Sequence, residues 1–323
     1  MLAVRLHETG GPERLVVEDI PKPEPAGGEV LVRVRAAALN HRDVFITQGL
    51  YPNIELPRTL GADGVGDLDG TRVVIDPMLG WGDDPAVWAP GATILGMPRD
   101  GTFAQYVAVP KGNVHPAPAH LSDAEAAALP LAGLTAYRAV FTRAKLQAGE
   151  TVLITGIGGG VQSFALLYAK HIGARAIVTS SSDAKLERAK QLGADVAINY
   201  RTTPDWHKVA RKAGAIDVAI DSAGGDAFAK AIALVRPGGR VVTYGGTAGD
   251  ATVKLFPLFW NHVTVYGTSM GSPQDFRGML ALFADRSLRP VVDEVFPMRD
   301  VVAAANRLND AGQFGKIVLQ IDA

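Results

Sequence analysis

Short apolar runs alternate with helix-period segments along the second half of the chain. Between Val161 and Ile172 the apolar residues recur at the spacing of one helix face, and Gly173 is placed to end that helix. The apolar runs that predict buried strands are Thr151–Ile154, Ala176–Thr179, Val196–Ile198, Val218–Ile220, Arg240–Thr243 and Val263–Tyr266. Strand, helix and strand repeated in this order predict an α/β fold with a doubly wound parallel sheet.

The first 120 residues follow a different pattern, which is β-rich. Val30–Arg35 alternates apolar and polar residues, so it predicts a strand with one buried face. Residues 77–102 are rich in Gly and Pro and have no sustained period, so we expect an irregular lobe there.

A change of pattern near residue 122 marks a domain boundary. Ser122 and Glu125 have the spacing of a capping box and open an alanine-rich run. We therefore predict a β-rich domain over residues 1–121, a nucleotide-binding domain over 122–267 and a tail over 268–323. A last strand is expected over Gly315–Ile321, and periodicity alone does not say which domain it joins.

Composition excludes several classes of protein. The 323 residues include no cysteine, which excludes disulfides, thiolate-ligated zinc and a cysteine nucleophile. The net charge of −1 gives no long-range attraction to nucleic acid or to an anionic membrane. No window reaches 18 apolar residues, and the first residues do not form a secretory signal. We expect a cytoplasmic protein with a small-molecule partner.

A glycine-rich loop connects the first strand of the predicted sheet to its first helix. The loop residues that we expect to bind a cofactor are Gly156, Gly158, Gly159, Gly160 and Val161. Glycines between a strand and a helix let bare backbone approach a pyrophosphate at the positive end of the helix. The sixth position of the motif is Val161 where a glycine is usual, so a tight turn without a ligand stays an alternative.

The end of the second predicted strand favours NADP over NAD. Ser180, Ser181 and Ser182 stand where an NAD site has an acidic residue, and serine hydroxyls can donate to a 2′-phosphate. Lys185 and Arg188 follow on the next helix and can supply positive charge. The alternative is that the serines cap this helix while the two cations face solvent.

The order of motifs resembles the medium-chain dehydrogenase/reductase superfamily, on its zinc-free side near the NADPH quinone oxidoreductases and the enoyl-type reductases. Besides the glycine loop, the residues that carry the resemblance are Ala38–Asp43, Gly49–Pro52, Leu60–Gly66, Leu131–Tyr137 and Phe314–Val318. The resemblance implies a chaperonin-10-like (GroES-like) catalytic domain, a Rossmann domain, a tail that returns to the first domain, and a cofactor between the domains.

The same resemblance argues against a catalytic zinc. Asn40, Ala62, Asp63 and Leu131 stand at the ligand positions of zinc-dependent relatives, and Ala62 and Leu131 have no donor atom. The lobe lacks the four cysteines of a structural zinc site, so packing around Trp81 and Trp88 is expected to hold it. A metal site built from His41, Asp43 and Asp63 is a minor alternative to a polar pair formed by His41 and Asp43.

The resemblance also assigns individual residues. It implies that Asn40 and Thr135 touch the nicotinamide ribose and carboxamide, and that Tyr51 is an active-site tyrosine. Ser181, Lys185 and Tyr200 match 2′-phosphate contacts. Further cofactor-lining positions are Tyr244, Gly245, Phe314, Gly315 and Lys316. Gln162 departs from the family pattern, which usually has glycine or alanine there.

These residues predict a metal-independent NADPH-dependent oxidoreductase. Hydride passes to a quinone or to the β-carbon of an α,β-unsaturated carbonyl compound, Asn40 and Tyr51 stabilise the resulting anion, and Tyr51 or solvent protonates it. Tyr51 could instead only pack against substrate. Two other functions stay open, a non-catalytic NADPH-binding protein and a metal-dependent alcohol dehydrogenase. The strand at 263–266 is expected at the sheet edge, which favours a homodimer.

Overall fold

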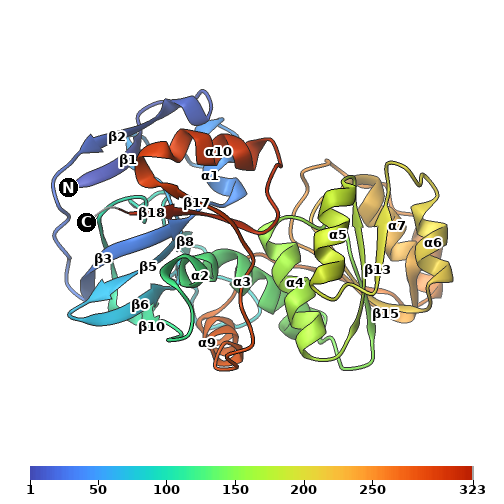
Figure 1. Cartoon of the computed structure of the whole chain (residues 1–323). Coiled ribbons are helices and arrows are strands. Elements are labelled where there is room, and N and C mark those ends of the chain that lie inside the picture. The colour runs from blue at the N-terminus through green and yellow to red at the C-terminus, as the bar shows by residue number, and fades with distance from the viewer. Residues whose placement is uncertain (322–323) are drawn as a thin grey trace. The chain divides into compact units, whose positions relative to one another are not determined.

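A computed structural model describes residues 1–321 and divides into two compact units (Figure 1). Unit 1 comprises Met1–Leu134 and the residues from Gly271 onward, and unit 2 comprises Thr135–Met270. The sequence places the first division after residue 121 instead of residue 134. The difference is α2 (Asp123–Ala128), which packs on strands β3 and β5 of unit 1 (Glu29–Ala38 and Asp63–Leu68). A capping box at Ser122 and Glu125 starts this helix, as the sequence predicts.

Unit 2 is built on one parallel six-stranded sheet, which confirms the predicted Rossmann fold. The sheet order reverses direction beside β11, the strand that leads into the glycine loop. In spatial order the strands are β13 (Val196–Asn199), β12 (Arg175–Ser180), β11 (Thr151–Ile154), β14 (Ile216–Asp221), β15 (Val235–Thr243) and β16 (Thr264–Gly267). Each of the six predicted strands is present, and β16 lies at the edge of the sheet as expected.

Helices cover both faces of this sheet. Figure 1 shows α4 and α5 on one face and α6 and α7 on the other. Gly159 is the N-cap of α4, and the positive φ of Gly173 ends the helix in the conformation that glycine adopts most easily. The boundary between the units falls within α3 (Pro130–Tyr137). The further helical segments of unit 2 are the π-helical η3 (Arg138–Arg143), α4 (Gly160–His171), α5 (Asp183–Gln191), α6 (Trp206–Lys212), α7 (Gly225–Leu234) and α8 (Leu255–Trp260).

Unit 1 is β-rich, and the C-terminal tail completes it. β18 (Lys316–Gln320) pairs antiparallel with β3, with Val318 opposite Ala38, so the tail returns to the first domain. The largest sheet has the order β10 (Val114–Pro116), β6 (Thr71–Ile75), β5, β3, β18 and β17 (Val292–Pro297), and β9 (Tyr106–Pro110) also pairs with β3. A second sheet has the order β2 (Leu15–Asp19), β1 (Leu2–Leu6) and β4 (Arg58–Thr59).

The strands, helices and turns of unit 1 pack around one apolar core. Val32, Ile75, Phe103 and Leu319, which come from distant parts of the chain, all belong to it. The helices besides α2 are α1 (His41–Thr47), α9 (Pro273–Leu282) and α10 (Val301–Asn309), and the 3-10 turns are η1 (Pro12–Arg14), η2 (Lys111–Asn113) and η4 (Met298–Asp300).

The lobe over residues 77–102 contains one short strand pair, β7 (Met78–Leu79) with β8 (Thr93–Ile94), and is otherwise irregular. Trp81 is buried, its ring centroid lies 6.4 Å from that of Trp88, and its indole N–H donates to the Asp84 carbonyl at 2.8 Å. Aromatic packing therefore helps to hold the lobe, as predicted. Within residues 1–321 no helix is long and apolar enough to cross a membrane.

Candidate functional site

The glycine loop has the backbone shape of a phosphate cradle. Gly156 and Gly158 have φ of +68° and +137°, a region that residues with a side chain rarely adopt. Gly159 then leads into α4, a helix of 12 residues. Because the first N–H groups of a helix have no intrahelical partner, this end carries a partial positive charge.

Side chains at the strand ends hold the loop in place. Thr155 donates from its hydroxyl to Asp221 at 2.7 Å, and the Asp221 carboxylate also accepts from the Gly224 N–H at 2.8 Å. On the other side, the Ile157 N–H donates to the Thr179 carbonyl at 2.7 Å. Burial raises the pKa of Asp221, while these hydrogen bonds act in the opposite direction. The loop is thus fixed to both β12 and β14.

The three predicted serines have different roles. Ser182 caps α5, because its hydroxyl accepts from the Lys185 N–H at 3.4 Å. Ser180 is buried, and its hydroxyl accepts from the Ser182 N–H at 3.3 Å. Ser181 is half-buried between them. The capping alternative therefore holds for Ser182, and contact of Ser181 with a ligand stays a prediction.

Lys185 reaches back from α5 to the glycine loop. Its side chain lies against Gly158 so closely that a Cβ at that position would come 3.1 Å from the ammonium nitrogen. Tyr200 lies at the end of β12, since its N–H donates to the Ser180 carbonyl at 3.0 Å, and its side chain is 43% exposed. Arg188 faces outward from the helix. The fold therefore places Lys185 beside the loop, and Ser181 and Tyr200 lie at the end of β12.

A second group of polar side chains lies at the ends of β14 and β15. Gln162, from the first turn of α4, donates through its Nε2 to the Ser222 hydroxyl at 2.5 Å. The backbone of Gly245 lies against the Ser222 carbonyl, where a Cβ would overlap it. The Tyr244 hydroxyl is buried beside Ser222, and this burial raises the pKa of Tyr244.

The predicted catalytic Asn40 lies in a buried ionic cluster of unit 1. The Lys316 ammonium donates to the Leu39 carbonyl at 2.7 Å, to Asn40 Oδ1 at 2.6 Å and to Asp63 Oδ2 at 2.8 Å. Asn40 Nδ2 in turn donates to Asp63 Oδ2 at 2.9 Å, and the Leu131 N–H donates to Asp63 Oδ1 at 2.7 Å. Because both ends of the Asn40 amide are engaged, its orientation is fixed.

The family resemblance implies that Lys316 lines the cofactor, and the structure shows that its ammonium is bound inside unit 1. The side chain is 3% exposed, and Phe314, two residues earlier, is 2% exposed. Gly315 between them has a φ of +105° and lies against the Val291 carbonyl. Contact between this segment and a cofactor stays a prediction, as it does for Thr135, which is buried in α3.

Tyr51 lies over an arginine that the sequence did not single out. The Arg42 guanidinium is 4.9 Å from the centre of the Tyr51 ring, and its Nε donates to the Tyr51 hydroxyl at 3.4 Å. Arg42 Nη1 is fixed by the Leu95 carbonyl at 2.9 Å. Since Arg42 donates to the Tyr51 oxygen, the phenol keeps its own proton for another acceptor.

Asp43 completes the surroundings of Asn40. Its Oδ2 accepts from the Asn40 N–H at 2.8 Å, while Oδ1 has no hydrogen bond to any described residue and lies 3.8 Å from the Arg42 guanidinium. Burial raises the pKa of Asp43 to about 6, although the neighbouring Arg42 acts to lower it. Asp43 therefore caps α1, and the predicted pairing of Asp43 with His41 stays a prediction.

Comparison with known proteins identifies the family. The alcohol dehydrogenase GroES-like domain matches residues 26–119, and the zinc-binding dehydrogenase family matches residues 160–285. The chain is 35% identical over 333 residues to a zinc-type alcohol dehydrogenase-like protein YogA of Leptosphaeria maculans, covering 94% of this chain and 93% of that protein. The chain belongs to the medium-chain dehydrogenase/reductase superfamily.

Two further relatives of this superfamily differ in the activity that their names give. One is an acryloyl-coenzyme A reductase of Metallosphaera sedula, 29% identical over 325 residues, which cover 94% of this chain and 95% of that protein. The other is a crystal structure of an NAD-dependent alcohol dehydrogenase, 38% identical, with a TM-score of 0.92 over 100% of both chains. The family therefore establishes an oxidoreductase and leaves its substrate and nucleotide open.

A dinucleotide fits the donor set of unit 2. The glycine loop has no side chains that would keep its backbone away from a phosphate. The N-terminus of α4 adds a partial positive charge, and the Lys185 ammonium adds a full one at the same loop. Within the superfamily fold, Gly156, Gly158 and Gly159 would face the phosphates, while Ser181 and Lys185 would lie toward the ribose.

A catalytic zinc does not fit the donor set of unit 1. Of the four residues at the superfamily's ligand positions, Ala62 and Leu131 have no side-chain donor, and Asn40 and Asp63 are already bound to the Lys316 ammonium. Across residues 1–321, no group of three His, Cys, Asp or Glu side chains is close enough to hold a metal. A cation next to Lys316 would also meet its positive charge.

Sequence reasoning missed three residues of these clusters. Arg42 stands beside a predicted site residue, but its contact with Tyr51 depends on the turn after α1. Asp221 and Ser222 follow a predicted strand, and polar residues at the carboxyl end of a parallel strand are a usable signal for a ligand site. The contacts that Lys316 makes with Asn40 and Asp63 join residues 276 and 253 positions apart, so no local pattern shows them.

Proposed function

We propose that the protein is an NADPH-dependent, metal-independent reductase of quinones or α,β-unsaturated carbonyl compounds. The observation that carries the proposal is the Lys316 ammonium bound to Asn40 and Asp63. Oxidation of an alcohol in zinc-dependent relatives needs a Lewis acid to stabilise the alkoxide, and this cluster has no free ligand set for one. Reduction of an electron-poor acceptor needs only a hydride donor and groups that stabilise an anion.

When bound, NADPH would supply a hydride, which forms a C–H bond at the β-carbon of an enone or reduces a quinone and leaves an enolate or a hydroquinone anion. The protein then has to hold the developing negative charge and deliver one proton. Tyr51 is suited to both tasks, because its hydroxyl accepts from Arg42 and can donate its own proton to the acceptor oxygen. Asn40 is held rigidly by Lys316 and Asp63, so it can orient a ligand without reorganisation.

The preference for NADPH rests on the end of β12. Ser181 and Lys185 offer donors there. Positions 180–182 are all serine, so the acidic residue that is usual at an NAD site is missing. The solved relative at 38% identity is described as NAD-dependent, so the preference needs a direct test.

Oxidation of NADPH and of NADH, followed optically against a panel of quinones and enones, tests the function. We expect acceptor-dependent oxidation that is faster with NADPH and that a zinc chelator does not change. Tyr51→Phe should lower kcat by about 10²-fold, the lower range for loss of a positioned proton donor. Tight NADPH binding without acceptor-dependent oxidation would instead favour the non-catalytic binding protein, and loss of activity with chelator would favour the metal-dependent dehydrogenase.

We also propose a homodimer, formed at the β16 edge of the unit 2 sheet. In the described part of the chain β16 pairs only with β15, so its outer edge is open. The adjacent α8 exposes Leu255, Phe256, Phe259 and Trp260, each by more than 60%. A patch of this kind is typical of a surface that another protein covers. Sedimentation at twice the 34.0 kDa chain mass is expected, and a monomer would contradict it.

A further inference from the structure

The Gln162 side chain lies across the glycine loop. Its Oε1 packs against the Cα of Gly159 so closely that a Cβ on Gly159 would overlap it. Its Nε2 donates to the Ser222 hydroxyl at 2.5 Å. Gln162 belongs to the first turn of α4, and Ser222 follows β14, so this one side chain spans from the helix to the end of the strand.

The part of the amide that faces the loop is its oxygen. This oxygen carries a partial negative charge and sits at the end of α4 where the N–H groups have no intrahelical partner. A phosphate oxygen is attracted to the same place for the same reason. The glycine at position 159 leaves the backbone bare, and the amide oxygen of Gln162 fills the space that results.

We infer that Gln162 is an internal competitor for the pyrophosphate, held over the glycine loop by Ser222. Binding of a dinucleotide requires this side chain to leave Ser222 and turn away from Gly159, which lowers affinity and slows association. The side chain is half-buried and has three rotatable bonds, so it can move without unfolding of α4. The inference rests on the proposed function in one respect, namely that the loop binds a dinucleotide.

Gln162→Ala removes the competitor and keeps the helix, since alanine is the best helix former. We expect the Kd for NADPH and for NADH, measured by fluorescence, to fall about threefold to tenfold, the range that one neutral hydrogen bond represents. Stopped-flow measurement should place most of the change in the association rate. Adenosine 2′-monophosphate lacks the pyrophosphate, so its affinity should not change. Gln191→Ala, at an exposed position of α5, is the matched control.

Gln162→Glu tests the electrostatic side of the inference. The side chain keeps its length, but a full negative charge replaces the amide dipole at the helix end and is held there more strongly. Both dinucleotides should bind at least about tenfold more weakly at low salt, because like charges then compete for one place. High salt should reduce this loss.

Weaker or unchanged dinucleotide binding by Gln162→Ala would overturn the inference, and weaker binding would show that the amide donates to the nucleotide instead. The proposed function fails in a different way, with no binding of NADPH or NADH to either the wild-type protein or Gln162→Ala. That result would also overturn the inference, because no ligand would then compete for the loop.

Discussion

The two units use polar groups in opposite ways. In unit 1 the Lys316 ammonium has three acceptors, Leu39, Asn40 and Asp63, and all of them are buried with it. In unit 2 the glycine loop presents bare backbone at a helix end, and the side chain over it is a neutral glutamine. The first cluster is already satisfied by its own residues, whereas the second leaves donors that a ligand can take.

This difference separates stability from binding. Removal of one member of the closed cluster leaves a buried charge without a partner, so its main effect should be on folding. Removal of a side chain at the open loop leaves no buried charge, so its main effect should be on nucleotide affinity. The following variants test this separation, from the largest expected effect to the smallest.

Lys316→Met should destabilise unit 1 by about 3–5 kcal/mol, the cost of an uncompensated buried charge, here Asp63. Urea unfolding followed by fluorescence measures the change. Asp63→Asn combined with Lys316→Met removes both charges and should recover much of the loss. Lys111→Met, at an exposed position of η2, should change the unfolding free energy by less than about 0.5 kcal/mol. Equal effects of the two lysine variants would contradict the closed cluster.

Asp43→Asn should reveal a pH dependence next to this cluster, since Asp43 bonds to the Asn40 N–H. Burial raises the folded-state pKa of Asp43 to about 6, above its unfolded value of about 3.9. The folded state therefore favours the protonated form of Asp43. Its contribution to the free energy of unfolding is complete below about pH 4 and is lost as the pH rises through 6. One unit of pKa difference corresponds to about 1.4 kcal/mol. Between pH 4 and pH 7 the unfolding free energy of the wild type should therefore fall by about 2–3 kcal/mol relative to that of Asp43→Asn. Parallel stability profiles of the two proteins would contradict this.

The sequence predicts the scaffold of both units better than it predicts their contacts. Strand β11 begins and ends at the predicted residues, and the glycine loop and α4 follow as expected, because their signals lie within a few neighbouring residues. The role of Lys316 could not be predicted in the same way, because its partners Asn40 and Asp63 are brought to it only by the pairing of β18 with β3. Gln162 was recognised as a departure from the family pattern, but its bond to Ser222 joins residues 60 positions apart.

Lys185→Ala tests the open site in unit 2. Lys185 lies against Gly158 and should contact the 2′-phosphate, so its removal should weaken NADPH binding about tenfold, or about 1.4 kcal/mol, and NADH binding much less. The unfolding free energy should hardly change. Lys190→Ala, on the same helix but paired with Glu187 at the surface, is the control. Equal weakening of NADPH and NADH would contradict the 2′-phosphate assignment.

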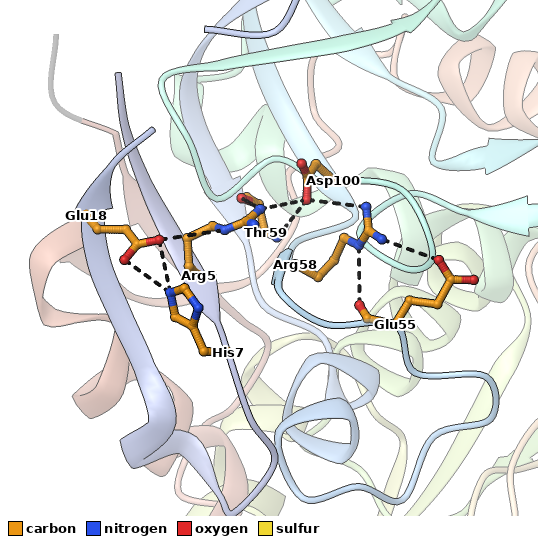
Figure 2. Close-up of polar contacts among 7 residues, drawn as sticks. All are labelled: Arg5, His7, Glu18, Glu55, Arg58, Thr59 and Asp100. Atoms are coloured by element: carbon orange, nitrogen blue, oxygen red, sulfur yellow. Dashed lines mark hydrogen bonds and ion pairs between the residues drawn. The ribbon is translucent and has the colours of Figure 1, made fainter. Parts of the chain in front are cut away.

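The smallest effect is expected in an ionic network on the surface of unit 1. Figure 2 shows Arg58 between Glu55 and Asp100, with Arg5 bonded to the same Asp100 at 3.1 Å. Glu55 and Asp100 are 62% and 51% exposed, so water screens these pairs and each should contribute less than about 1 kcal/mol. Arg58→Ala should therefore lower the unfolding free energy by less than 1 kcal/mol, and 1 M salt should remove most of that difference. A loss as large as that of Lys316→Met would mean that exposure does not distinguish the two ionic clusters of unit 1, and the contrast with the buried lysine would fail.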